Sequence, residues 1–247
     1  MLRLTGLIFT VCVAMALAQA QAPQIQADIP TILSRMANAQ QQNAARSRAF
    51  TVTRDYQLLD KGMEPKAQIV AEITFVPPNQ KQYQIQSSHG GLGEKVLRDI
   101  LNRETEMPKD PQRKALTTEN YDFQLLGREV VDGRQCFVLG LKPKREDKEL
   151  IRGKAWVDAE TYNVRRVEGN PAKSPSWWIH DIYVLMTFAE VDGMWLRTFT
   201  HAVANVRFKG RYEMVSRDLD YRPAQQAAVQ RRSNRRQALL AGAALNP

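Results

Sequence analysis

The sequence contains only two cysteines, Cys12 and Cys136, and it has neither paired CxxC motifs nor an HExxH motif. Such cysteine and histidine pairs are the usual ligands of zinc, so we expect no metal site. If Cys12 is removed with a leader segment, Cys136 has no partner and the fold is not held by an internal disulfide. Cys136 lies beside Phe137 in an apolar stretch, so we predict a buried packing residue rather than a nucleophile.

Motifs of nucleophilic and phosphate-binding enzymes are also missing. No GxSxG, GxGxxG or GxxxxGK[ST] pattern occurs, and the three histidines are His89, His180 and His201. His180 and Asp181 are adjacent in a predicted strand, where neighbouring side chains point to opposite faces. We therefore expect them not to act as a base and its orienting group. With no catalytic constellation, the sequence predicts a protein without enzymatic activity and without a cofactor.

Only the start of the chain carries a long apolar run. Arg3 is followed by the uncharged stretch 4–17 and by the triplet Ala18-Gln19-Ala20. A positive start, an apolar run and a small-x-small triplet are the parts of a secretory signal, here with cleavage expected after Ala20. The run is shorter than the ~20 residues of a spanning helix, and Cys12 inside it does not suit lipid attachment. We predict that residues 1–20 are cleaved and that the protein is exported to the periplasm, where it is soluble.

Acidic residues are missing from the other end of the chain. The formal net charge is +9, and much of it lies in a segment that contains Arg222, Arg231, Arg232, Arg235 and Arg236. Composition favours a flexible, solvated tail over residues 223–247. The alternative is a helical tail whose last four arginines, spaced four apart in two pairs, contact anionic lipid headgroups or an acidic partner. Nucleic acid is not an expected partner of an exported chain.

Between these ends, residues 21–222 are predicted to form one domain made mostly of strands. Apolar and polar residues alternate from residue 50 onward, and Asp132-Gly133 and Asp192-Gly193 are typical hairpin turns. Helical spacing appears in two places only, at residues 28–50, where Asp28 can cap the helix, and at 92–101. Nine or ten strands without alternating helices predict a mainly β (α+β) fold built on one large, curved antiparallel sheet or an open barrel.

Aromatic residues are concentrated in the second half of the chain. Ordinary sheet core explains any single one of them, but an open sheet covered by only two helices can also enclose apolar space for an acyl chain. The candidate residues of this apolar cleft are Trp156, Trp178, Phe188, Trp195 and Phe199.

Residues 133–169 resemble a signature of the LolA-like family of periplasmic lipoprotein-sorting proteins. The matching positions are Gly153, Ala155, Trp156, Val157, Asp158 and Thr161. The resemblance implies an open half-barrel with a long N-terminal helix and a short internal helix on its concave side. It also implies non-catalytic binding of lipid or of acylated lipoproteins. The alternative within the same fold is an envelope interaction or stress-sensing domain that carries no lipid.

Overall fold

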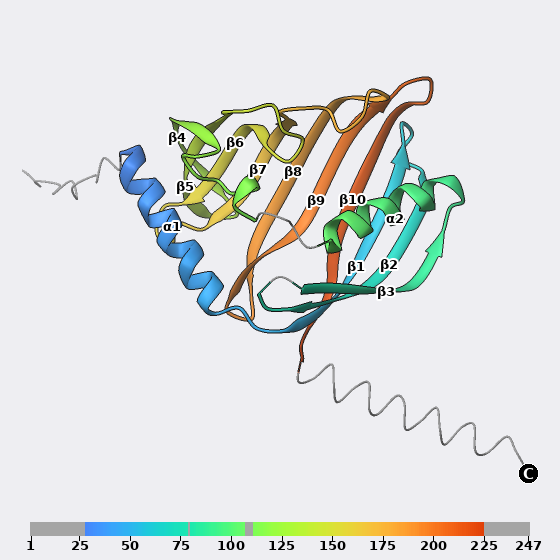
Figure 1. Cartoon of the computed structure of the whole chain (residues 1–247), viewed down its shortest axis with the longest axis horizontal. Coiled ribbons are helices and arrows are strands. Elements are labelled where there is room, and N and C mark those ends of the chain that lie inside the picture. The colour runs from blue at the N-terminus through green and yellow to red at the C-terminus, as the bar shows by residue number, and fades with distance from the viewer. Residues whose placement is uncertain (1–27, 79, 107–110, 225–247) are drawn as a thin grey trace, which may run out of the picture.

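The computed structural model describes residues 28–78, 80–106 and 111–224 (Figure 1). Two α-helices, α1 (Ile29–Ala45) and α2 (Leu92–Thr105), and the short 3-10 helix η1 (Pro111–Lys114) accompany ten strands. The strands are β1 (Phe50–Asp60), β2 (Pro65–Val76), β3 (Gln80–His89), β4 (Tyr121–Val131), β5 (Arg134–Pro143), β6 (Ile151–Asp158), β7 (Val164–Pro171), β8 (Ile179–Val191), β9 (Met194–Val206) and β10 (Gly210–Pro223). The predicted signal segment and the four tail arginines lie outside the described residues. Within the described ranges, no helix is both long and apolar enough to cross a membrane.

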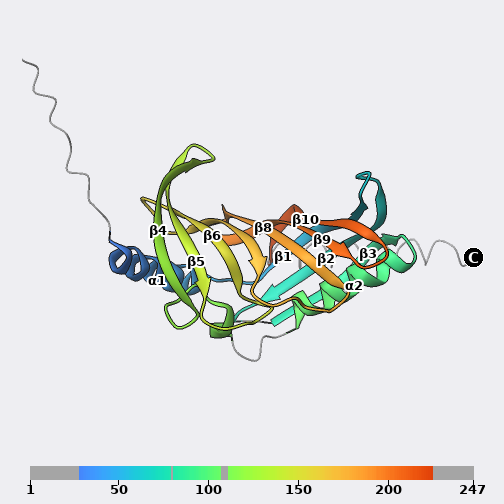
Figure 2. The ribbon, with the colours of Figure 1, turned by 90° about the horizontal axis from the view of Figure 1, so that it is seen from above.

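All ten strands belong to one antiparallel sheet with the order β3-β2-β1-β10-β9-β8-β7-β6-β5-β4. Neighbouring strands are consecutive in the chain except β1 and β10, whose pairing joins the first three strands to the rest. Because β3 and β4 are edge strands, the sheet does not close on itself. The sheet is strongly curved, and both α-helices lie on its concave side (Figure 2). These observations confirm the predicted open, mainly β fold.

Helix α1 begins at the predicted residue and ends earlier than predicted. The Asp28 carboxylate accepts a hydrogen bond from the Thr31 backbone N–H at 3.0 Å, which caps the first turn. Ile32 and Met36 are one turn apart, and both are buried against the sheet. Beyond Met36 the helix offers little apolar surface to bury, so it ends at Ala45 instead of continuing to Phe50.

Helix α2 covers the other end of the concave face. Its Leu97 and Leu101 are fully buried in a core formed with β1 and β2. The chain enters this helix through Gly90, where φ is 119° and an added Cβ would lie 2.3 Å from the Ala67 Cα. A glycine is therefore required for the helix to approach β2 this closely.

The concave face thus carries packed clusters on either side of its centre. One lies under α2 and includes Val52, Leu58 and Ile69. On the other side, Phe137, Leu139 and Val157 lie under α1, next to a group of buried residues on β4 to β7. Strands β8 and β9 lie between these clusters.

The opposite face of β5 and β6 has a smaller apolar cluster of its own. Cys136, Val138 and Trp156 pack together there and are almost completely buried. The predicted burial of Cys136 is confirmed, and burial raises the pKa of its thiol. Because Trp156 alternates with Val157, it points away from the helices.

Candidate functional site

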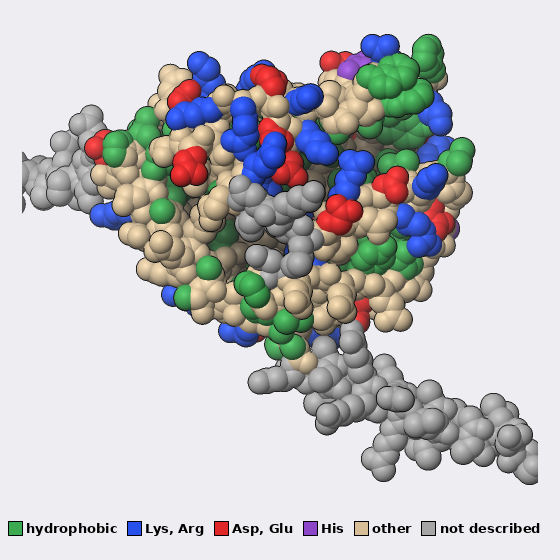
Figure 3. Space-filling view, in the orientation of Figure 1, with side chains coloured by type: hydrophobic (Ala, Val, Ile, Leu, Met, Phe, Trp, Pro, Cys, Tyr) green, Lys and Arg blue, Asp and Glu red, His purple; other side chains and the backbone are tan. Residues whose placement is uncertain are grey.

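The concave face is least covered at its centre. On β8, Val184, Met186 and Phe188 border the buried cluster of β4 to β7, while Met214 on β10 borders the cluster under α2. Ala202 on β9 pairs with both Val184 and Met214, so these side chains share one face. All five are half-buried, and we call them the concave floor. Figure 3 looks onto this face, which is hollowed near its centre. The concave floor is therefore apolar surface that the two helices leave accessible.

Beside the concave floor, a charged cluster ties the end of α2 to the sheet. Arg54 on β1 donates hydrogen bonds to Asp218 on β10, with one of them at 3.1 Å, and to Glu104 on α2. Glu104 also accepts from the Tyr56 hydroxyl at 2.8 Å and from Arg197 at 2.5 Å. The Arg54 and Glu104 side chains are only 9% and 12% exposed. The five side chains form one network in which each charge has an opposite partner.

Burial and charge compete for the ionisation of the two carboxylates. Burial opposes the ionisation of Glu104, but the positive charges of Arg197 and Arg54 outweigh it and lower the pKa of Glu104 to about 2. For Asp218 the balance is reversed, because burial raises its pKa more than its bonds to Arg54 lower it. Burial and the nearby Glu104 charge also raise the pKa of the Tyr56 hydroxyl. Of the two carboxylates, Glu104 is therefore the one whose ionised form the fold stabilises.

We expect Glu104 to make the fold sensitive to acid. Its pKa is lower in the folded protein than the ordinary value of 4.5. Its contribution is therefore fully present above pH 4.5 and lost as the pH falls toward 2, and it amounts to roughly 3 kcal/mol. The raised pKa of Asp218 changes stability with pH in the opposite direction, so the effect of Glu104 has to be isolated. The wild type is therefore compared with Glu104→Gln by urea unfolding between pH 2.5 and 7. The variant should show a shallower decline of stability below pH 4.5, because other carboxylates with lowered pKa values, such as Asp158 and Glu213, still contribute. Equal slopes would contradict the assignment.

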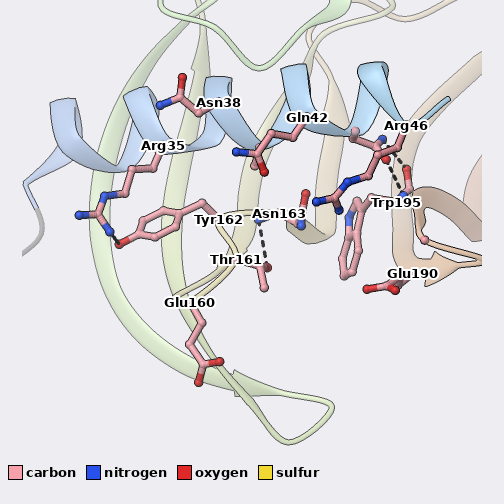
Figure 4. A pocket seen from close by; sticks show the side chains of 13 residues that line it. Arg35, Asn38, Gln42, Arg46, Glu160, Thr161, Tyr162, Asn163, Glu190 and Trp195 are labelled. Carbon is pink, nitrogen blue, oxygen red and sulfur yellow. Dashed lines mark hydrogen bonds between the residues drawn. The ribbon is translucent and has the colours of Figure 1, made fainter.

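A second hollow, a polar groove, lies along α1 (Figure 4). It has a volume of about 470 Å³ and lies between the helix and the β6–β7 and β8–β9 turns. Asn43 fixes this side of the helix, because its side chain bonds the Trp195 backbone N–H at 2.7 Å and carbonyl at 2.9 Å. The groove is lined by Arg35, Asn38, Ala39, Gln42, Asn43, Arg46, Glu160, Thr161, Tyr162, Asn163, Glu190, Gly193 and Trp195. Its lining suits a polar or charged ligand rather than an acyl chain.

Of the five aromatic residues singled out from the sequence, Phe188 lies on the concave floor and Trp195 lines the polar groove. The Trp195 indole N–H donates to the Val164 carbonyl at 2.7 Å, and the Arg165 guanidinium lies 5.5 Å from its ring centroid. The two side chains therefore have different surroundings. Phe188 presents apolar surface, whereas Trp195 is held by polar contacts.

The other three aromatic residues lie elsewhere. Trp156 lies on the convex side, where its indole N–H donates to Glu129 at 2.8 Å. Phe199 also faces that side, under Arg217, because it alternates with Thr200, which pairs with the floor residue Met186. Trp178 is 51% exposed in the loop between β7 and β8. The structure does not bring the five side chains into one cleft.

The expectation that His180 and Asp181 cannot meet is wrong. The His180 Nδ1 lies 2.7 Å from an Asp181 carboxylate oxygen. Asp181 has a φ of 51°, and the register with β9 shifts between His180 and Tyr183, so the side chains do not alternate there. Hydrogen bonds from Asn205 and His180 lower the pKa of Asp181. Within the described ranges, no group of three or more His, Cys, Asp or Glu residues could hold a metal ion.

The charged cluster was not predicted from the sequence, although β1 contains a signal for it. Arg54 occupies the alternating face that also carries Val52, Tyr56 and Leu58, and it is buried with them. A buried arginine requires an opposite charge. The interruption of an apolar face by arginine therefore predicts a carboxylate partner, although it does not say which one.

No protein-family model and no curated protein matches this sequence. Among solved structures, the chain is similar to a LolA superfamily protein from Nitrosomonas europaea, with 14% identity, a TM-score of 0.40, and coverage of 78% of this chain and 92% of the other. The chain is also similar to an outer membrane lipoprotein-sorting protein domain from Vibrio parahaemolyticus, with 15% identity and a TM-score of 0.41. This match covers 75% of this chain and 91% of the other. A DUF1329 family protein from Desulfovibrio piger is similar with 14% identity and a TM-score of 0.41, and the match covers 79% of this chain and 92% of the other. LolA-like structures are thus among those similar to this chain, as the sequence resemblance indicates, but at these values they assign it no ligand.

Proposed function

We propose that this protein is an exported, periplasmic binding protein that holds the apolar chain of a lipid or of an acylated lipoprotein on its concave floor, without catalysis. The supporting observation is the half-buried apolar surface formed by Val184, Met186, Phe188, Ala202 and Met214 between the two helix-covered clusters. The signal-like start of the sequence supports export.

The energetics suit such a ligand. A sixteen-carbon chain buries ~14 methylenes at ~0.8 kcal/mol each, a gross gain of ~11 kcal/mol before the costs of association. Arg197 lies opposite Phe188 in the β8–β9 register, and at 32% its side chain is more exposed than those of Arg54, Glu104 and Asp218. The carboxylate or phosphate of a lipid headgroup could therefore meet Arg197 at the border of the concave floor.

Two neighbouring residues of β8 give a matched test of this proposal. Met186 is on the concave floor, whereas Leu185 pairs with His201 on the opposite face, and both side chains are half-buried. Met186→Gln should weaken binding of a long-chain fluorescent fatty acid about tenfold, because it removes apolar contact equivalent to one or two methylenes. Leu185→Gln should leave the affinity within about twofold of the wild type.

The measurement is a fluorescence titration of the mature protein and both variants, with urea unfolding of each protein as a control for stability. Lipid that co-purifies with the wild type is identified by mass spectrometry. Equal losses of affinity in the two variants would contradict binding on the concave floor. A wild type that carries no lipid and ignores the fatty acid would rule out the carrier function.

A second candidate function is an interaction domain that carries no lipid, and the polar groove favours it. Tyr162 and Trp195 supply aromatic surface there, and Arg46 has no carboxylate within ion-pair distance among the residues that the structure describes. Such a lining can hold an extended polar segment of a partner protein. Absence of lipid binding in the titration would leave this function as the better hypothesis.

A further inference from the structure

The structure brings two loops together at the rim where β9 joins β10. The Arg207 backbone N–H donates to the Trp178 carbonyl at 2.8 Å, and Ile179, the first residue of β8, pairs with Val206, the last residue of β9. The Ser174 hydroxyl lies 2.7 Å from the Ser176 carbonyl oxygen, which holds the β7–β8 loop in shape. The loop and the turn therefore form one connected tip rather than two independent segments.

Three large aromatic side chains are exposed at this tip. Trp177 and Trp178 are 64% and 51% exposed and stack with their ring centroids 4.2 Å apart, and Phe208 is 97% exposed. Figure 3 shows hydrophobic side chains gathered at this rim with basic ones beside them. We call Trp177, Trp178 and Phe208 the aromatic tip. So much exposed aromatic surface at one point of a protein usually marks a binding surface.

Besides its exposure, Phe208 has an unfavourable backbone conformation. Its φ is 65°, in the left-handed region that bulky residues rarely adopt and that asparagine or glycine would occupy more easily. With almost no contact surface, its side chain returns little packing energy to the folded state. Local strain and exposure at one residue indicate a role outside the fold.

Basic side chains surround the aromatic tip. The Arg207 guanidinium lies 5.6 Å from the Trp177 ring centroid. Lys173 and Lys209 are exposed, and neither has an ion-pair partner among the residues that the structure describes. One carboxylate, Asp181, lies nearby, bonded to His180 and Asn205, so the three cations outnumber it. The charge at the tip is therefore positive.

We propose that the aromatic tip docks the protein on an anionic lipid bilayer. Tryptophan is enriched where membranes meet water, because its ring is apolar at one end and polar at the other. Lysine and arginine beside it would meet the headgroup phosphates. A protein interface needs about 800 Å² on each side, which three side chains at a protruding tip do not supply. Docking through the aromatic tip is independent of ligand binding on the concave floor.

Sedimentation with lipid vesicles tests the proposal on the full mature chain. The wild type should bind phosphatidylcholine vesicles that contain 30% phosphatidylglycerol, and at least tenfold more weakly those of phosphatidylcholine alone. The triple variant Trp177→Ala, Trp178→Ala, Phe208→Asn should lose at least tenfold in partitioning to the anionic vesicles. Asparagine suits the backbone at position 208, so the variant should fold as well as the wild type, which thermal unfolding checks.

Two further variants test whether membrane binding depends on the aromatic tip itself. Leu126→Ala with Val130→Ala removes side chains of the edge strand β4 that are 46% and 61% exposed, and this variant should bind like the wild type. Replacing Arg231, Arg232, Arg235 and Arg236 by glutamine measures any contribution of the tail. Binding of the tip variant within twofold of the wild type would overturn the proposal. So would a wild type that binds neither kind of vesicle, which would point to a protein partner for the tip instead.

Discussion

Replacement of Arg54 by methionine is expected to lower the free energy of unfolding by about 3–5 kcal/mol. Arg54 is the cation that lies between Glu104 and Asp218, and the side chains of these two carboxylates are only 12% and 18% exposed. Without the guanidinium, two negative charges remain close together with Arg197 as their nearest remaining cation. Methionine fills a similar volume, so the effect reports the loss of charge rather than a cavity.

Urea unfolding at pH 7 measures this effect, and Arg48→Met is the matched control. Arg48 also pairs with an aspartate, Asp192, but both side chains are more than 40% exposed. An exposed pair of this kind contributes ~1 kcal/mol or less. Adding Glu104→Gln and Asp218→Asn to Arg54→Met should restore part of the lost stability, because the unpaired carboxylates are then neutral. A loss below 1 kcal/mol for Arg54→Met would show that the cluster is not a strong restraint on α2.

Much of the fold could be predicted from local patterns in the sequence. The Asp132-Gly133 and Asp192-Gly193 dipeptides predict hairpin turns, and all four residues have positive φ in the structure. Asp28 predicts the start of α1 and caps it. These features depend on a few consecutive residues, which is why a single sequence reveals them.

The face on which each side chain lies could not be predicted in the same way. On β5, the consecutive residues Cys136, Phe137, Val138 and Leu139 are all buried. A strand that is buried on both faces shows no alternation, so the pattern does not say which residues face the helices. The sequence consequently placed Trp156 among the candidates for an apolar cleft, and the structure shows it on the convex side beside Glu129.

The charged cluster could not be predicted from the sequence for a different reason. Arg54 is 50 residues from Glu104 and 164 residues from Asp218 in the sequence. Their contact depends on the pairing of β1 with β10 and on the placement of α2 over β1. Local periodicity carries no information about either. The polar groove depends in the same way on how α1 lies against distant turns.

Gly153→Ala is expected to destabilise the protein by about 3 kcal/mol or more. Gly153 on β6 pairs directly with Gly169 on β7. A Cβ at Gly153 would lie 2.0 Å from the Glu168 carbonyl oxygen and 2.7 Å from the Gly169 Cα. These neighbours are backbone atoms of a paired strand, so they cannot move aside without breaking the ladder between β6 and β7.

Gly140→Ala on the neighbouring strand β5 gives the matched control. A Cβ there would meet only side-chain atoms, at 3.5 Å or more, which is an ordinary contact. Its stability should stay within about 0.5 kcal/mol of the wild type or rise slightly, because alanine reduces the freedom of the unfolded chain. Both variants are measured by urea unfolding. Equal stabilities would mean that the β6–β7 ladder yields to a methyl group, and that the close approach of Gly153 and Gly169 is not what requires glycine there.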